Sequence, residues 1–388
     1  MSKLGELRHQ KWAVWLPPLV VVVAVFLFPL FREPLDETVS DATVTLAFVV
    51  FALGLNIVVG FAGLLDLGYV AFYAFGALVS GWLASDHFTG IGGDSGIDFG
   101  VSDFAAGLPG IHLNFLLLVI GAILVCAVVG AIIGLPTLRL RGDYIAIVTL
   151  AFGEIIGRVA QNGDELTVNN YAFSNGRESI SPIDQLNFPI VGEFDSATNV
   201  RPYFWAALAL VLVVLFVNIR LRDSRLGRAW VALREDEVAA ASMGVPLVRT
   251  KLMAYAVGAG FGGISGVFLG VFFNSVNANQ FLFGFSILIL AMVIMGGLGS
   301  IWGVVIGATI LAYANNNLLP TLDRSFISDG LTDIGLEFTF SQINFGIFGF
   351  ILLLMMVLRP QGILPERRRK MELAEGIGGD STLAEAKR

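Results

Sequence analysis

The chain has 388 residues, of which 56% are hydrophobic and 14% are charged, and its mean hydropathy is +0.78. So few polar groups could not cover the surface of a water-soluble protein of this size, so the composition excludes an ordinary soluble domain. The formal net charge of −7 gives no reason to expect nucleic acid as a partner, and the single cysteine, Cys126, excludes an intramolecular disulfide and a thiolate metal site.

Apolar segments follow one another along most of the chain, and each is long enough or nearly long enough to cross a bilayer as a helix of roughly 17–25 residues. The predicted fold is an all-α polytopic membrane protein with about ten transmembrane helices in one domain, residues 1–370. The predicted spans are residues 14–31, 44–59, 69–84, 113–135, 144–160, 204–219, 252–273, 284–296, 301–318 and 343–358.

The distribution of basic residues sets the orientation of these spans. If both termini are cytosolic, the segments predicted to lie inside hold 19 of the 24 Lys and Arg residues, as the positive-inside rule requires. Adding or removing one span would destroy this sorting. We expect the first span to be an uncleaved anchor, since no small-residue cleavage site follows it, and the tail at 371–388 to be a disordered cytosolic segment.

Two of the spans are short and run into glycine-rich stretches. Span 44–59 leads into 60–68, and span 284–296 leads into 296–303. One interpretation is a pair of tight cytosolic turns; the other is broken or re-entrant helices beside a translocation path, where protein or water covers the irregular backbone. The second interpretation makes path candidates of Asn56, Gly60, Gly63, Gly68 and Tyr69, although Asn56 also fits a role in holding helices together.

The span at 144–160 carries the main ionisable candidate within the membrane. Glu154 and Arg158 are four residues apart on one helical face, which favours a neutralising ion pair. A role for Glu154 on the translocation path is the second interpretation. Thr149 lies in the same span and joins the path candidates.

The largest basic interruption is the cytosolic segment at 220–251. Within it, a short helix is expected to open at Arg234, Glu235, Asp236 and Glu237, to carry small side chains at Ala239 and Ala240, and to end at Gly244 before Pro246. A short capped helix in the cytosol is typical of a docking element.

Glycines recur every four residues along the following span, at Gly258, Gly262, Gly266 and Gly270. This spacing lines one helical face and predicts a close approach to another helix. Packing within the chain and a subunit interface both remain open.

The sequence lacks the motifs of common catalytic sites. It has no phosphate-binding G-x-x-x-x-G-K-[ST] loop, no nucleophile elbow and no histidines at metal-ligand spacing, so we predict no catalytic residue, no metal and no enzyme activity. Energy for transport would then come from an ion gradient or from another subunit. An ion-driven secondary transporter and a noncatalytic channel or scaffold are the alternatives to a subunit of a larger transporter. The few buried titratable groups count against the first, and the capped segment at 234–244 counts against the second.

Four stretches resemble the LivM-type permeases of branched-chain amino-acid ABC importers. They are GLNIVVGFAGLLDLGYVAF at 54–72, LRGDYIAIVTLAFGEI at 140–155, the cytosolic stretch at 227–244, and the glycine-rich turn at 296–303. They occur in the order found in that family. Glu237, Ala239, Ala240 and Gly244 match the Glu-x-Ala-Ala…Gly core of the importer coupling helix, although the Leu-Pro that often follows is absent.

The resemblance implies one permease subunit of a heterodimeric pore in the cell membrane of a prokaryote. Its implied partners are a second permease, two cytosolic ABC ATPases that use ATP and Mg, and an extracytoplasmic substrate-binding protein. No cofactor is expected in this chain. The implied cargo is leucine, isoleucine or valine, while urea, short amides and other amino acids stay open because related permeases carry them.

Overall fold

The computed structural model describes residues 22–89, 96–101, 108–137, 143–168, 171–188, 192–322, 344–359 and 361–364. Several sequence predictions lie partly or wholly outside these residues. They concern the start of the first span, residues 140–142 of the stretch at 140–155, the first residue of the span at 343–358, and the tail at 371–388.

The described residues are mainly helical, and the predicted class of helical polytopic membrane protein is confirmed. Five of the described helices are long and apolar enough to cross a membrane, and shorter apolar helices accompany them. In chain order the helical elements are Val22–Phe31 with η2 (Phe28–Phe31) as its last turn, α3 (Glu37–Leu55), η3 (Asn56–Phe61), α4 (Val70–Leu83), η4 (Asp86–Phe88), α5 (Phe115–Thr137), α6 (Asp143–Gln161), α7 (Arg201–Asp223), α8 (Arg225–Glu235), α9 (Glu237–Ser242), α10 (Leu247–Phe272), η5 (Ala278–Phe281), α11 (Phe283–Gly296), α12 (Ile301–Tyr313), η6 (Ala314–Leu318), α13 (Leu319–Leu322) and α15 (Asn344–Leu358).

The second span is longer than predicted. Asp36 caps α3 by accepting a 2.8 Å hydrogen bond from the Thr38 amide, and the helix continues as a π-helical turn to Phe61. The polar residues near its start did not end it, because a threonine hydroxyl can bond within its own helix; Thr43 donates to the Val39 carbonyl at 2.7 Å. The predicted start at residue 44 was therefore wrong.

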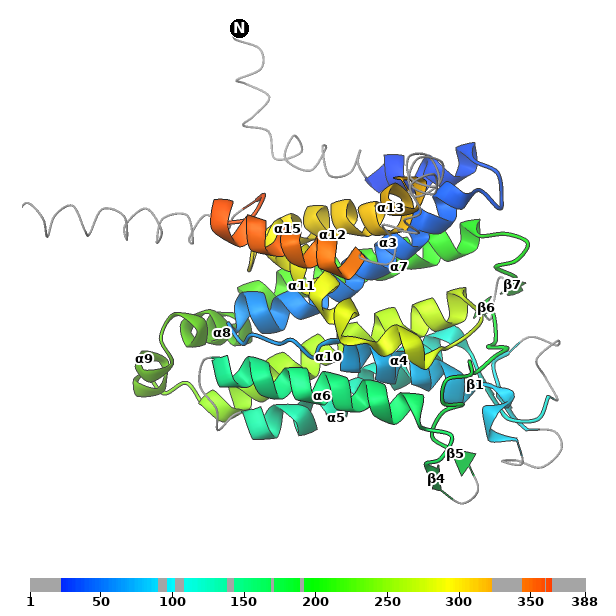
Figure 1. The fold of residues 1–388 in the computed structure, drawn as a ribbon, viewed down its shortest axis with the longest axis horizontal. Helices are drawn as coiled ribbons and strands as arrows, with labels where there is room; N and C mark the ends of the chain where they lie inside the picture. The colour runs from blue at the N-terminus through cyan, green and yellow to red at the C-terminus, as the bar shows by residue number, and fades with distance from the viewer. Residues whose placement is uncertain are drawn as a thin grey trace, which may run out of the picture.

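The long helices run side by side along the molecule, with α3 and α10 at the centre (Figure 1). In the apolar 18-residue stretch of each helix, 94% is buried for α3 and 78% for α10, whereas only 33% is buried for α5. The outward side chains of α5 are apolar and include Leu116, Ile120, Leu124 and Val128. Such a face suits contact with lipid.

The glycine stripe of α10 lies inside the chain, against α3 and α4. A Cβ atom at Gly258 would lie 2.5 Å from the Val58 side chain, and one at Gly262 would lie 3.0 Å from the Phe72 Cβ. At Gly266 and Gly270 the neighbours include the backbone of Ala77 and the side chain of Ser80. Of the two interpretations left open by the sequence, the structure therefore shows packing within the chain.

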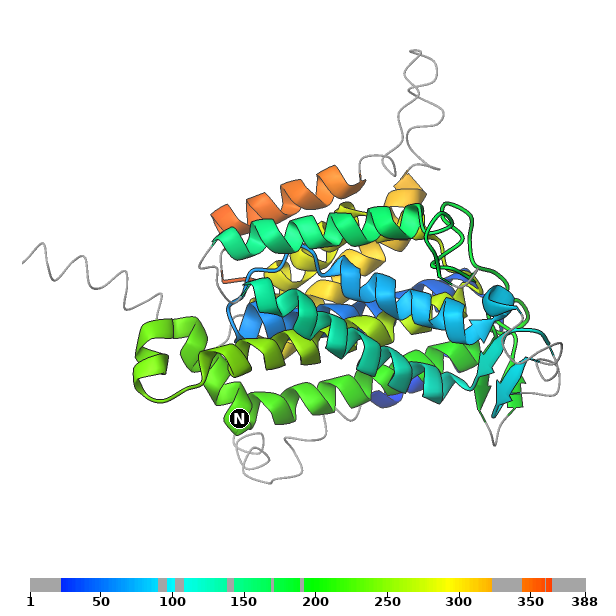
Figure 2. The same ribbon diagram turned by 90° about the horizontal axis from the view of Figure 1, so that it is seen from below.

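Short strands, which the all-α prediction did not include, gather at one end of the helices (Figures 1 and 2). A three-stranded sheet has the order β1-β3-β2, with β3 antiparallel to β1 and parallel to β2, and Ala84 and Asp98 both pair with His112. The strands are β1 (Ala84–Ser85), β2 (Ile97–Phe99), β3 (Ile111–Leu113), β4 (Thr167–Val168), β5 (Tyr171–Ala172), β6 (Leu186–Phe188) and β7 (Gly192–Phe194). We call this end of the molecule the strand end; α8 and α9 lie at the opposite end, the α9 end.

Candidate coupling and transport site

The segment between α7 and α10 contains two short helices instead of the single predicted one. Arg234 and Glu235 close α8, and Asp236 separates the helices. The Asp236 carboxylate accepts hydrogen bonds from the Val238 and Ala239 amides at 2.8 and 2.9 Å, so it caps α9. The prediction that Arg234 opens the short helix was wrong, because the Asp236 side chain accepts hydrogen bonds from the first amides of α9 and the new helix begins at Glu237.

The helix α9 projects from the bundle with most of its surface in solvent (Figure 1). Val238 is 68% exposed and Met243, just after the helix, is 85% exposed, while Ala240 is buried against the rest of the chain. Exposed apolar side chains on a short, capped helix are typical of an interaction surface.

Gly244 ends this element as the sequence predicts. Its φ of +85° lies in the left-handed region that favours glycine. A Cβ atom there would meet no atom within 4 Å. The requirement for glycine at this position is therefore one of backbone conformation alone.

Arg234 joins α8 to the first glycine-rich stretch. Its Nη1 donates a 2.5 Å hydrogen bond to the Gly60 carbonyl. Gly63 has a φ of +71°, and a Cβ atom there would lie 2.5 Å from the Arg234 Cγ. The arginine side chain thus lies directly against the irregular connection between η3 and α4.

The two glycine-rich stretches meet at Asn56. Its Oδ1 accepts a 3.0 Å hydrogen bond from the Gly299 amide, and both groups are buried. A Cβ atom at Gly60 would collide with the Asn56 carboxamide and lie 2.6 Å from the Gly299 nitrogen. The turn between α11 and α12 is a tight one, in which Gly297 and Gly299 have positive φ.

A further segment, which the sequence analysis did not single out, packs against the turn between α11 and α12. Residues 361–364 follow α15, and the amides of Ile363 and Leu364 donate to the carbonyls of Met295 and Gly296 at 2.8 and 3.1 Å. Gly362 sits against Gly297. The available sequence signal was a glycine shortly after an apolar helix, and in the structure Gly362 has a positive φ of +75°.

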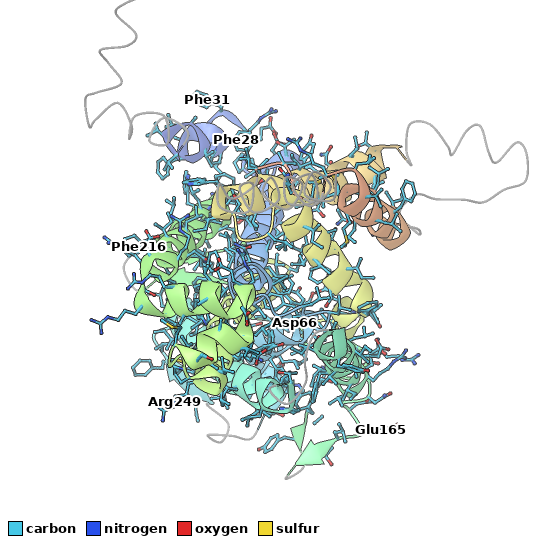
Figure 3. All side chains as sticks on the ribbon, turned by 90° about the vertical axis from the view of Figure 1, so that its left-hand side faces the viewer. Phe28, Phe31, Asp66, Glu165, Phe216 and Arg249 are labelled. Carbon is cyan, nitrogen blue, oxygen red and sulfur yellow. The ribbon has the colours of Figure 1, made fainter. Side chains whose placement is uncertain are left out.

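Helix α6 contacts the other side of the first connection. The Thr149 hydroxyl accepts a 3.0 Å hydrogen bond from the Leu67 amide, and the Gly68 backbone packs against Thr149 and Gly153. Asp66, in the connection outside the helices, accepts from the Gly68 amide at 2.9 Å. Its burial raises its pKa to about 7, although the hydrogen bond from Gly68 lowers it. Figure 3 shows Asp66 near the middle of the α9 end, with Phe216 and Arg249 at the periphery.

Tyr69 is fully buried at the start of α4. Its hydroxyl donates a 2.6 Å hydrogen bond to the Gly258 carbonyl, and its ring stacks on Phe51 with centroids 4.8 Å apart. In this structure Tyr69 therefore holds α3, α4 and α10 together.

Glu154 is separate from the other path candidates. Arg158 donates from Nε to its Oε1 at 3.0 Å, so the structure contains the expected ion pair. The two side chains are 45% and 63% exposed on the outer face of α6. They do not reach the interior of the chain.

A cavity of about 320 Å³ opens beneath α9, and we call it the coupling cavity. Its charged lining consists of Arg234, Glu237 and Lys251. The Lys251 side chain is only 4% exposed, and its ammonium lies 2.7 Å from the Glu237 carboxylate. The rest of the lining is apolar or small: Ala62, Gly63, Leu64, Leu65, Ile145 and Leu233.

The structure therefore brings most of the predicted residues together. Asn56, Gly60, Gly63, Gly68 and Thr149 surround the first connection, and Arg234 and Glu237 reach it from α8 and α9. Lys251 and Asp66 were not predicted as parts of the site. No sequence spacing relates Lys251 to Glu237, because the turn between α9 and α10 decides that contact.

Apolar membrane-length helices, with a solvent-exposed short helix joined to glycine-rich connections at one end, are typical of an integral membrane transport protein. The family model for the permease component of branched-chain amino acid transport systems matches residues 38–358. The chain therefore belongs to this permease family.

Individual relatives agree with the family match. The chain is 34% identical to the high-affinity branched-chain amino acid transport system permease protein LivM of Salmonella typhimurium, over 94% of this chain and 78% of the relative. It is 27% identical to the probable LivM of Methanocaldococcus jannaschii, over 82% and 91%. It is 25% identical to the LivH permease of Escherichia coli K12, over 85% and 95%. No solved structure matches the chain.

Proposed function

We propose that this chain is one permease subunit of an ATP-driven ABC importer that carries leucine, isoleucine and valine into a prokaryotic cell. The family match supports the importer over the secondary transporter and over the channel or scaffold. Relatives named as LivM and as LivH permeases of one kind of transport system both match the chain. This supports a heterodimeric pore with a second, related permease.

The exposed helix α9 carries the proposal of ATPase docking. It presents Val238, Met243 and a face of small residues to solvent, and Arg234 and Glu237 tie its base to the membrane domain. A short helix of this kind fits a groove on a cytosolic ATPase. ATP and Mg would be bound there by the two ATPases, and this chain would need no cofactor of its own.

The outer face of α6 is the side on which we place the second permease and the translocation path. A charged pair that faces lipid is costly, whereas one that faces a water-filled path or a partner is not. Glu154 and Arg158 lie on that face, while the outer face of α5 is apolar. The strand end would then face outward and receive the substrate-binding protein.

The test is a pull-down of the tagged chain from its native membrane in mild detergent, with mass spectrometry of its partners. Two ATPases and a second permease are the expected result. The Glu237→Lys variant serves as the matched control, which should retain the permease and lose the ATPases. Recovery of the chain alone, even after crosslinking, would contradict the proposal.

A further inference from the structure

We propose that the coupling cavity binds a free neutral aliphatic amino acid from the cytosol, and that cargo accumulated in the cell thereby slows its own import. This inference rests on the proposed function. Three features of the cavity carry it: its size, the arrangement of its charges, and its position between the docking helix and the glycine-rich connection.

The size limits the ligand. A cavity of about 320 Å³ is near the lower end of the range for small-molecule pockets, about 300–1,000 Å³. That volume is sufficient for one amino acid. Leu65 is partly exposed while Leu64 and Ile145 are buried, so the cavity opens to solvent near Leu65 and extends inward to Leu64 and Ile145.

The charges match the backbone of an amino acid. Arg234 and Lys251 bring two positive charges and Glu237 brings one negative charge, so the lining has a net charge of +1. An arginine guanidinium has five N–H donors and a lysine ammonium has three, which suits a carboxylate. Glu237 already accepts from the Lys251 ammonium at 2.7 Å, and its carboxylate has further lone pairs for the ligand's ammonium group. Urea and simple amides have neither charge and would gain little here.

The remaining wall matches an aliphatic side chain. Leu64 and Leu65 of the connection, Ile145 of α6 and Leu233 of α8 line the cavity beside the charged groups. No hydroxyl or amide side chain is among the described lining residues. Burying a branched aliphatic side chain against such a wall is favourable, whereas a polar side chain would lose its hydrogen bonds to water.

The position connects occupancy to transport. Glu237 is the first residue of α9, Lys251 belongs to α10, and Arg234 bonds to the Gly60 carbonyl in the connection. A ligand that touches all three would favour the arrangement of α9 against the connection seen here. Because a ligand stabilises the conformation that binds it more tightly, occupancy would oppose the movement of α9 that ATP-driven transport requires.

The test uses the whole importer in proteoliposomes with the ATPases facing the medium. ATP-driven transport fed by the substrate-binding protein is measured first, and L-leucine, L-valine, urea or acetamide is then added on the ATPase side. L-Leucine and L-valine should inhibit, and urea and acetamide at equal concentration should not. Binding of radiolabelled L-leucine to the purified importer, without ATP or binding protein, gives a second readout.

Two variants test the site. Lys251→Met should weaken leucine binding and inhibition about tenfold or more, because it removes a charge-assisted hydrogen bond. Ile145→Phe should fill the cavity and abolish both, and it keeps the test decisive if the Lys251 variant fails to fold. Arg225→Met removes a charge from the exposed start of α8, outside the cavity, and should leave the leucine affinity unchanged. Each inhibition is normalised to the variant's own uninhibited rate.

The two proposals fail in different ways. Absence of ATP-driven transport would contradict the proposed function. Normal transport with no leucine binding up to about 10 mM, well above a Kd of about 1 mM, would overturn the inference alone. So would leucine binding that both cavity variants leave intact. Crosslinking of Lys251 to an ATPase carboxylate in the resting complex would also overturn it, because the ATPase would then be the occupant.

Discussion

Replacing Gly266 by alanine should destabilise the chain, because α4 and α10 touch at this position through their backbones. A Cβ atom at Gly266 would lie 2.7 Å from the Ala77 nitrogen and 3.0 Å from the Gly76 carbonyl carbon, and it would collide with the backbone carbonyl oxygen of Tyr73. Ordinary contact begins at 3.4 Å, so α4 would have to move away from α10 by about 0.7 Å to bring the Ala77 nitrogen from 2.7 Å to that distance. Backbone atoms cannot rotate away as a side chain can.

The expected magnitude follows from two opposing effects. Overpacking of a tight interior costs about 1–3 kcal/mol, and a backbone contact belongs at the upper end of that range. Alanine in place of glycine within a helix gains about 0.5–1 kcal/mol. The net loss in the free energy of unfolding is therefore about 2 kcal/mol.

Reversible unfolding of the purified chain in mixed micelles measures this loss, and α15 offers a matched control. A Cβ atom at Gly349 would meet no atom within 4 Å, so Gly349→Ala should raise stability by about 0.5–1 kcal/mol. A Gly266→Ala variant as stable as the Gly349→Ala variant would refute the close approach of α4 and α10.

Three further changes probe the connections and the docking helix. Asn56→Leu should lower the free energy of unfolding by about 1–3 kcal/mol in the same assay, because it leaves the buried Gly299 amide without its acceptor. Unchanged stability would show that this hydrogen bond is unimportant. Glu237→Lys should abolish ATP-driven uptake without lowering the amount of permease in the membrane, because the new ammonium would lie against Lys251. Normal uptake by this variant would contradict the proposal that an ATPase docks at α9. Gly244→Val should keep the fold but impair coupling, because the φ of +85° at this position would cost a branched residue about 1–2 kcal/mol. Gly244→Asn should keep both the fold and coupling, because asparagine tolerates a positive φ. Equal uptake by the two variants would contradict this account.

The docking segment shows how far local sequence signals reach. The charged start, the small residues and the terminal glycine located a short helix near the observed α9, because capping and helix ends depend on neighbouring residues. The boundary was misplaced by three residues. Asp236 can begin a new helix as readily as it can continue one, and only the observed bonds to Val238 and Ala239 decide between the two.

The glycine stripe shows where such signals stop. Its four-residue spacing predicted a close helix contact, which exists, but the spacing does not identify the opposing helix. Only the tertiary packing shows that the opposing helices are α3 and α4. The same limit explains why Glu154 was grouped with Asn56 and Thr149, although α6 turns Glu154 outward and Thr149 inward.

The sequence by itself determined the membrane class, the approximate positions of the helices and the approximate location of the short helix α9. These depend on apolar length and capping, which are properties of contiguous segments. Only the tertiary structure decided that Arg234 meets Gly60, that Asn56 meets Gly299, and that residues from four separate segments enclose the coupling cavity. These contacts depend on how helices distant in sequence pack together, and no local pattern encodes that packing.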